Sequence, residues 1–291
     1  MKILIVIIPF LFNCKEVNYT KKQTVQVEQT LNNTTNNAYS WKSTYSIENK
    51  LINRIAVPKG FVRTSVSKNS FEDWLRNLPL KEGNPKVKLY NGKFKNNQTA
   101  QYSVIDIDVG TRDLQQCADA VMRLRAEYLF SNELKEKIAF NFTSGDKCEY
   151  KSWSNGVRPK ISGNSVSFNK TKEADYSYKN FMSYMQTIFT YCGTYSLDKE
   201  LKIKKIEHLK AGDVFIKGGF PGHAVIVVDV AINTVSKEKI FLLAQSYMPA
   251  QDIHILKNPI DDSLSPWFSV KFGETLQTPE WNFNKSTLKE F

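Results

Sequence analysis

The sequence has few of the residues that build metal centres and disulfide frameworks. Its 291 residues include three histidines and four cysteines, and no two cysteines form a Cys-x-x-Cys pair. A zinc site therefore has little support, and we expect no cofactor. Besides Cys14, the cysteines are Cys117, Cys148 and Cys192, so at most one disulfide can form among these three and at least one thiol stays free.

Long apolar segments are also scarce. Residues 3–12 form one apolar run after Lys2, too short to cross a bilayer as a helix, and Cys14 follows it. This order is typical of a signal peptide, and the LFNC stretch resembles a bacterial lipobox, whose cysteine is lipidated. We therefore expect residues 1–13 to be a signal peptide and Cys14 to anchor the exported protein to a membrane of the bacterial cell envelope, on its periplasmic or surface side. A cleaved secreted form and an uncleaved anchor are the alternatives.

The chain has no long block of Lys or Arg, although its formal net charge is +11. It also has no recognisable nucleic-acid-binding motif, and export would keep it away from nucleic acids. A spread positive charge favours solubility and contact with anionic polymers or lipid headgroups. We therefore expect peptidoglycan or another envelope polymer as partner, together with the membrane reached through Cys14, and no nucleic acid.

Composition divides the chain into a tether and a body. Residues 14–40 are rich in Asn, Thr, Gln and Lys and contain few large aliphatic side chains, which is typical of an unpacked tether. From Trp41 onward the apolar and aromatic content is that of a globular protein. No repeat or linker divides this part, so we expect a single body over 41–291, with an N-terminal part at 41–100.

Hydrophobic periodicity predicts an α+β body. Helices are expected before a C-terminal run of closely spaced strands, which favours antiparallel pairing. Residues 223–230 and 240–244 are apolar at almost every position, so their sheet should be covered on both faces. If Asp113 caps the longest helix, Cys117 lies a full turn inside it. The expected helices are 69–80, 111–132 and 175–193, and the expected strands are 54–64, 87–92, 101–110, 137–144, 212–219, 223–232, 239–247 and 252–256.

A cysteine on a helix and a histidine that opens a later strand suggest a catalytic pair. The segment GDVFIKGGFPGHAVIVVD (212–229) resembles the hairpin of CHAP and NlpC-type amidases and peptidases. QCADAV (116–121) resembles the Gln-Cys helix start of CHAP domains, and GNSVSF (163–168) is similar to the GNA-plus-aromatic segment between the two. The resemblance implies a papain-like core at about 101–291, with a central helix packed on an antiparallel sheet.

This resemblance also assigns roles. Cys117 would be the nucleophile, His223 its base and Gln245 the polar residue that orients the imidazole. Gln116 or Gln115 would contact the oxyanion. A thiol needs such a base within hydrogen-bond reach, and the base needs a third group to fix its tautomer. The implied activity is cleavage of amide bonds, with peptidoglycan peptides as the natural substrates.

Other interpretations remain open at this stage. In the NlpC alignment, DYSY (175–178) replaces the Asp-Cys-Ser-Gly segment, so Tyr176 stands where the cysteine should be and only Ser177 is left as a nucleophile. Cys117 also falls on the apolar stripe of its helix, as a structural cysteine would. The protein would then be a catalytically inactive envelope-binding or scaffold lipoprotein, and an acyltransferase would share the same residues. His254 is predicted to be an exposed strand residue.

A second resemblance covers the chain from about Arg54 to Phe291. DLQQCADAVMRLRAEYL, FPGHAVIVVDVA and TPEW resemble segments of an uncharacterised family of bacterial lipoproteins, domain of unknown function 4846. The resemblance implies one structural unit over this range and brings no assigned activity.

Overall fold

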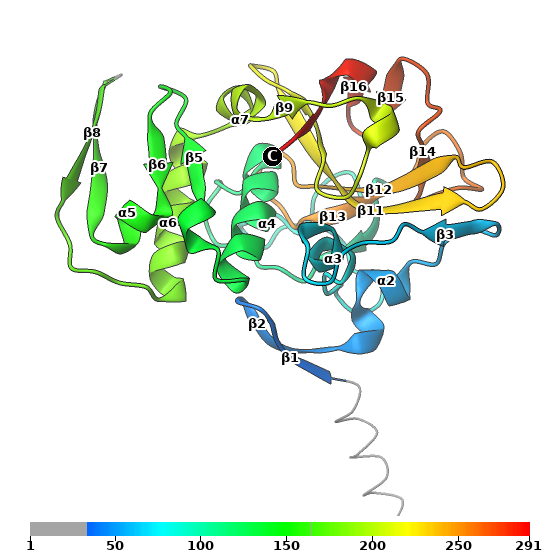
Figure 1. The fold of residues 1–291 in the computed structure, drawn as a ribbon, viewed down its shortest axis with the longest axis horizontal. Helices are drawn as coiled ribbons and strands as arrows, with labels where there is room; N and C mark the ends of the chain where they lie inside the picture. The colour runs from blue at the N-terminus through cyan, green and yellow to red at the C-terminus, as the bar shows by residue number, and fades with distance from the viewer. Residues whose placement is uncertain (1–33, 164) are drawn as a thin grey trace, which may run out of the picture.

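An antiparallel nine-stranded sheet organises the computed structural model, which describes residues 34–163 and 165–291 (Figure 1). The predicted signal peptide and Cys14 lie outside the described residues. The strand order is β4-β13-β12-β11-β10-β17-β9, with β3 on β11 and β14 on β12. The strands are β3 (Phe61–Arg63), β4 (Gln101–Val104), β9 (Lys202–Ile203), β10 (Val214–Lys217), β11 (His223–Asn233), β12 (Lys239–Gln245), β13 (His254–Leu256), β14 (Phe268–Ser269) and β17 (Leu288–Glu290).

Helices and small hairpins surround this sheet, and the described part of the chain contains six α-helices. The longest, α4, packs against β11 and contacts α6 (Figure 1). The fold is therefore α+β with an antiparallel sheet, as the sequence predicts. The helices are α2 (Leu51–Arg54), α3 (Phe71–Arg76), α4 (Cys117–Ser131), α5 (Tyr150–Ser154), α6 (Tyr178–Tyr191) and α7 (Thr194–Glu200), with 3-10 turns η1 (Ile47–Asn49), η2 (Lys135–Lys137), η3 (Ile206–His208) and η4 (Lys285–Thr287). The hairpins are β1 (Thr34–Tyr39) with β2 (Lys42–Ser46), β5 (Ala139–Asn141) with β6 (Lys147–Glu149), β7 (Val157–Ser162) with β8 (Ser165–Lys170), and β15 (Thr275–Gln277) with β16 (Asn282–Asn284).

The central strand β11 is buried on both faces. Ala224, Ile226 and Val228 join the core that includes α4 and α6. Val225 and Val227 join a second core, which the C-terminal strands complete. Alternate side chains of a strand point to opposite faces, so a nearly continuous apolar run needs a cover on each side. The expectation of a doubly covered sheet is confirmed.

Several local predictions differ from the structure. The strand expected at 54–64 is shortened to β3 (Phe61–Arg63), and Arg54 ends α2. The longest helix begins at Cys117, with Gln116 as its N-cap, rather than at a cap on Asp113. In place of the strand expected at 87–92, the structure has isolated bridges, in which Lys88 pairs with Phe94 and Leu89 pairs with Gln251. Residues 34–39, assigned to the tether, form β1, and Tyr39 is buried against Trp74.

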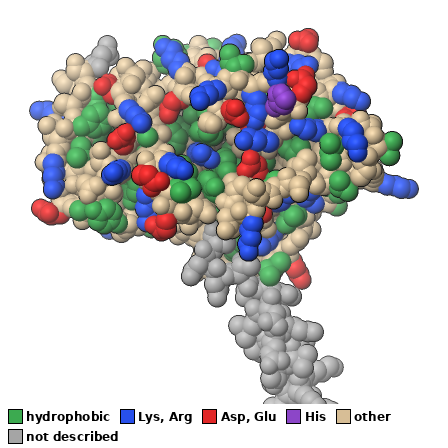
Figure 2. Space-filling model, viewed as in Figure 1, with side chains coloured by type: hydrophobic (Ala, Val, Ile, Leu, Met, Phe, Trp, Pro, Cys, Tyr) green, Lys and Arg blue, Asp and Glu red, His purple; other side chains and the backbone are tan. Residues whose placement is uncertain are grey.

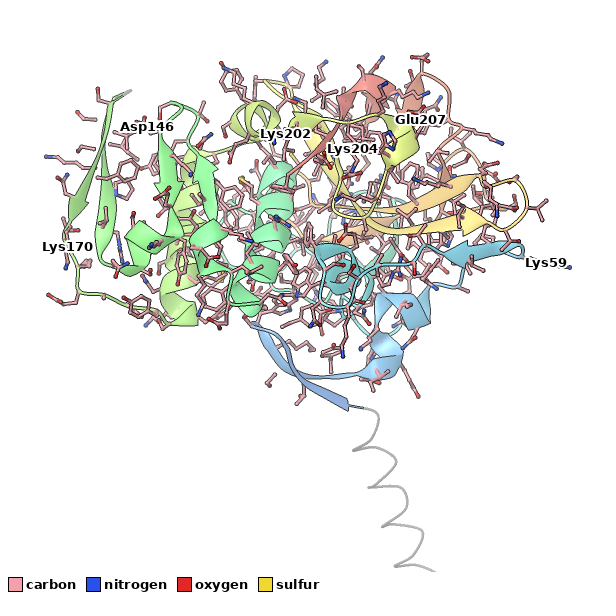
Figure 3. All side chains as sticks on the ribbon, viewed as in Figure 1. Lys59, Asp146, Lys170, Lys202, Lys204 and Glu207 are labelled. Carbon is pink, nitrogen blue, oxygen red and sulfur yellow. The ribbon has the colours of Figure 1, made fainter. Side chains whose placement is uncertain are left out.

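The positive charge is distributed over the surface. On the face in Figure 2, Lys and Arg side chains alternate with Asp and Glu and form no continuous basic field. Lys59 and Lys170 lie at opposite ends of the molecule (Figure 3). On this face, positive and negative side chains are therefore mixed. Within the described ranges, no helix is long and apolar enough to cross a membrane.

Candidate active site

Cys117 occupies the first position of α4. The backbone N–H of Gln116 donates to the carboxyl group of Asp119 at 3.0 Å, which closes the first turn. Asp113, which the sequence suggested as the cap, instead accepts from the backbone N–H of Ala250 at 2.7 Å. The thiol therefore lies at the helix N-terminus, where free N–H groups and the helix dipole favour negative charge.

His223 opens β11, and Gln245 ends the neighbouring strand β12. His223 Nε2 and Gln245 Oε1 are 2.9 Å apart, and both side chains are almost fully buried. An amide oxygen only accepts, so Nε2 carries the proton and donates it to Gln245. In this neutral tautomer, Nδ1 keeps its lone pair and can take up a proton. This hydrogen bond holds the imidazole ring of His223 in one orientation.

The loop before His223 is held tightly. Thr194 donates from Oγ1 to the carbonyl of Gly219 at 3.1 Å. A Cβ atom on Gly222 would lie 2.3 Å from that hydroxyl oxygen and 2.5 Å from the Gly219 carbonyl. Only glycine fits there, so the packing of the loop against the start of α7 fixes the position from which His223 projects.

Cys117 and His223 line one pocket of about 560 Å³. Gln116 lines it too, and Phe220 and Met248, which also line it, are largely exposed. The backbone of Ala224, the residue after His223, lies close enough to the Cys117 thiol to lower its pKa. Within the described ranges, no hydrogen bond links the Cys117 sulfur to the His223 ring. The fold thus brings the two residues to one pocket, although 106 positions separate them in the sequence.

Burial keeps both groups neutral in the free protein. Burial and, to a smaller extent, the nearby Asp119 raise the pKa of the Cys117 thiol to about 11, against hydrogen bonds from backbone groups that lower it. Burial also lowers the pKa of His223 to about 4, against the hydrogen bond that His223 donates to Gln245, which raises it. The desolvation cost therefore exceeds the help from the helix N-terminus. At neutral pH the pocket holds a thiol and a neutral imidazole.

The remaining sequence candidates lie elsewhere. Gln115 is buried and accepts from Arg123 at 3.0 Å, outside the Cys117 pocket. Tyr176 is exposed and donates to Asn155, and Ser177 caps α6. Neither lines the pocket. The segment 163–168 belongs to the β7–β8 hairpin at the far end of the molecule (Figure 1) and also lies outside it; residue 164 is not described.

The expectation for His254 is wrong. It is fully buried, and its Nδ1 lies 2.9 Å from the carbonyl oxygen of Asp252. Nδ1 therefore donates, and Nε2 faces the Gln245 amide nitrogen at 3.4 Å. Alternation within the short segment 252–256 suggested an exposed face, but β13 lies between β4 and β12 in the interior of the sheet.

Two residues near the site were missed. The Glu280 carboxylate accepts from Gln245 Nε2 at 2.8 Å and pairs with Lys95. Lys95 and Glu280 are 185 positions apart, and both side chains are largely buried. Isolated charges in loops give no sequence signal of such a partnership. The only available signal was the TPEW segment, which carries no chemical role by itself.

A titration should reveal the burial of His254. The pKa of His254 is lowered to about 4, first by burial, whereas an unfolded chain binds the proton near 6.5. Stability is therefore lost as the pH falls from 6.5 through 4, and the gap corresponds to about 3 kcal/mol. In His254→Gln, which keeps a donor and an acceptor, the His254 part of this loss should be absent, whereas His223, whose pKa is also lowered to about 4, should keep its own part. Urea unfolding of both proteins at several pH values measures it; parallel pH curves would contradict the assignment.

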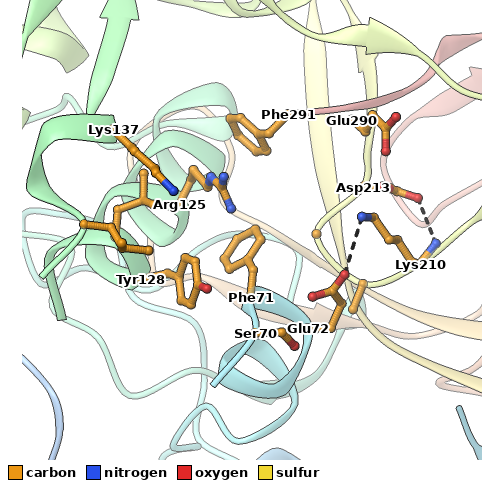
Figure 4. A pocket seen from close by; sticks show the side chains of 14 residues that line it. Ser70, Phe71, Glu72, Arg125, Tyr128, Lys137, Lys210, Asp213, Glu290 and Phe291 are labelled. Atoms are coloured by element: carbon orange, nitrogen blue, oxygen red, sulfur yellow. Dashed lines mark hydrogen bonds and ion pairs between the residues drawn. The ribbon is translucent and has the colours of Figure 1, made fainter. Parts of the chain in front are cut away.

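A second hollow, of about 280 Å³, lacks a comparable pair (Figure 4). The Arg125 guanidinium lies 4.9 Å from the centre of the Phe71 ring and 5.2 Å from that of Phe291. Glu72 pairs with Lys210 there. Among the residues that the structure describes, no cysteine or histidine lines this hollow, so the Cys117 pocket is the better candidate for covalent chemistry.

Comparison with known proteins adds a family and no activity. One family model, described as a domain of unknown function (4846), matches residues 51–290. No curated protein and no solved structure matches the chain.

Proposed function

Because that match spans most of the chain, the protein belongs to the family described as domain of unknown function 4846, and we propose that it is a papain-like cysteine hydrolase. It cleaves amide bonds, with peptidoglycan peptides as substrates, and is anchored in the cell envelope through a lipid on Cys14. One observation carries the proposal. A cysteine at a helix N-terminus and a histidine oriented by Gln245 line the same pocket.

The first half-reaction forms a thioester. Cys117 attacks the carbonyl carbon of the amide while its thiol proton passes to Nδ1 of His223. The negative oxygen that develops is stabilised by the free N–H groups at the start of α4 and by the side-chain amide of Gln116. His223 then gives the proton to the amide nitrogen as the C–N bond breaks, and the amine leaves.

The second half-reaction restores the enzyme. A water molecule attacks the thioester carbon and gives a proton to His223. The C–S bond breaks, the carboxylic acid leaves, and Cys117 regains its proton from His223. Because both groups are neutral at rest, proton transfer accompanies the attack, and a preformed thiolate is not required.

A second candidate function is a non-catalytic envelope-binding module of the same fold. The raised pKa of the Cys117 thiol favours it, since a thiol buried in apolar surroundings is unreactive. So does the lack, within the described ranges, of a hydrogen bond between the sulfur and the imidazole. These two functions differ in one measurable respect, which is the appearance of cleavage products that depend on Cys117.

The test is digestion of purified peptidoglycan by the full-length protein in detergent. Wild type should release fragments with new amine and carboxyl ends, identified by mass spectrometry, and Cys117→Ala should release none. Cys148→Ala is the matched control, because Cys148 is buried outside the pocket and its removal should leave the products unchanged. Identical product profiles for wild type and Cys117→Ala would exclude the hydrolase and favour the binding module.

A further inference from the structure

The Gln245 side-chain amide lies between three polar groups, which belong to His223, Glu280 and His254. Its oxygen faces His223 Nε2, and its nitrogen faces Glu280 Oε2 at 2.8 Å and His254 Nε2 at 3.4 Å. A glutamine amide can turn over and exchange its oxygen and nitrogen with little change in shape. The neighbouring polar groups therefore determine whether the amide oxygen or the amide nitrogen faces His223.

Among these neighbours, Glu280 has the strongest effect on the orientation of the Gln245 amide. An ionised carboxylate only accepts, so the amide group that faces it must be the NH₂ end. Lys95 forms an ion pair with Glu280, and Asn97 donates to its other oxygen at 3.1 Å. Both contacts favour the ionised carboxylate in an environment where an unpaired charge would be costly.

We propose that Glu280, held by Lys95, is a positioning residue for His223. It fixes the Gln245 amide with its oxygen toward His223, which places the imidazole proton on Nε2 and leaves Nδ1 as the base. His254 supports the same orientation, because its Nδ1 donates to Asp252 and only its Nε2 is left to accept. Without Glu280 the amide turns over in part of the molecules, and the proton moves to Nδ1, where it blocks the base.

The catalytic consequence of this inference rests on the proposed function, but the effect of Glu280 on the His223 tautomer can be measured without catalysis. The full-length protein with ¹⁵N-labelled histidine is examined by long-range proton–nitrogen NMR, which identifies the protonated ring nitrogen. Wild type should show His223 protonated at Nε2. The variant Glu280→Gln keeps an acceptor and should retain this tautomer, which would show rescue by the conservative change.

The decisive variant is Lys95→Met together with Glu280→Met. Replacing both partners by apolar side chains of similar length avoids leaving one buried charge unpaired, so the fold should persist. This double variant should show a mixture of His223 tautomers and at least a tenfold loss of amide hydrolysis. A loss of about tenfold or more is typical when a residue that orients a functional group through a hydrogen bond is removed. Glu290→Ala, which removes a carboxylate that pairs with Lys204 outside the Cys117 pocket, is the control and should change neither measurement.

The outcomes separate the two claims. A folded double variant whose His223 remains protonated at Nε2 overturns the positioning role, whatever its activity. A shifted tautomer together with wild-type protein that cleaves no peptidoglycan supports the positioning role and rejects the proposed function. A shifted tautomer with a tenfold loss in turnover supports both.

Discussion

Replacing His223 by glutamine should lower amide hydrolysis about 1,000-fold while the protein stays folded. A glutamine nitrogen can reproduce the hydrogen bond to Gln245 Oε1, but it provides no base at the position of Nδ1. Loss of a general base typically costs between about 100-fold and 10,000-fold. Initial rates on peptidoglycan fragments, followed by mass spectrometry, measure the effect. In wild type the rate should fall as the pH decreases through about 4, where His223 takes up a proton.

The same pair of proteins distinguishes a neutral pocket from a preformed ion pair. Alkylation of Cys117 by iodoacetamide follows the thiolate fraction. With a thiol pKa of about 11, its rate should keep rising through the alkaline range in wild type and in His223→Gln alike. His208→Gln is the matched control, because His208 is exposed in the η3 turn. A rate plateau near neutral pH that disappears in His223→Gln would contradict the neutral pair.

The sequence predicted the candidate site by residue type and order, but it could not predict the electrostatics. Cys117, His223 and Gln245 could be selected because a thiol, a base and an orienting group follow known chemical logic. Whether they meet depends on the pairing of β11 with β12 and on the packing of α4 against that sheet. The pKa values depend on burial, which is a property of the whole fold. Glu280 and Lys95 lie in loops, where no periodicity marks a partner.

Element boundaries show the same limit. The apolar stripe correctly indicated a helix around Cys117, but the carboxyl group that closes its first turn is Asp119 rather than Asp113. Both aspartates satisfy the composition rule for a helix start, and only three-dimensional contacts decide between them. That difference of one turn moves Cys117 from the interior of the helix to its N-terminus.

Asp229 is a buried ion-pair residue whose structural role could not be predicted from the sequence. It interrupts the apolar segment of β11 and could pass for a solvent-facing residue, yet it is fully buried. Arg63 Nε donates to one carboxylate oxygen at 2.6 Å, and Arg76 Nε donates to the other at 2.9 Å. The carboxylate therefore links β3 and α3 to the strand that begins with His223. The register of β11 with β12 shifts between Val227 and Asp229, so the pairing of the two strands is irregular next to this carboxylate.

Asp229→Ala should reduce the free energy of unfolding by about 3 to 5 kcal/mol, because it leaves two largely buried guanidinium groups without their counter-ion. Urea denaturation followed by circular dichroism measures this loss. Asp106→Ala is the matched control, since the Asp106 ion pair with Lys42 is about one-third exposed on each side and should contribute at most about 1 kcal/mol. Equal losses in the two variants would show that the arginines find other partners. A much larger loss at Asp229 would show that this buried ion cluster stabilises the packing of β3 and α3 on β11, the strand from which His223 projects.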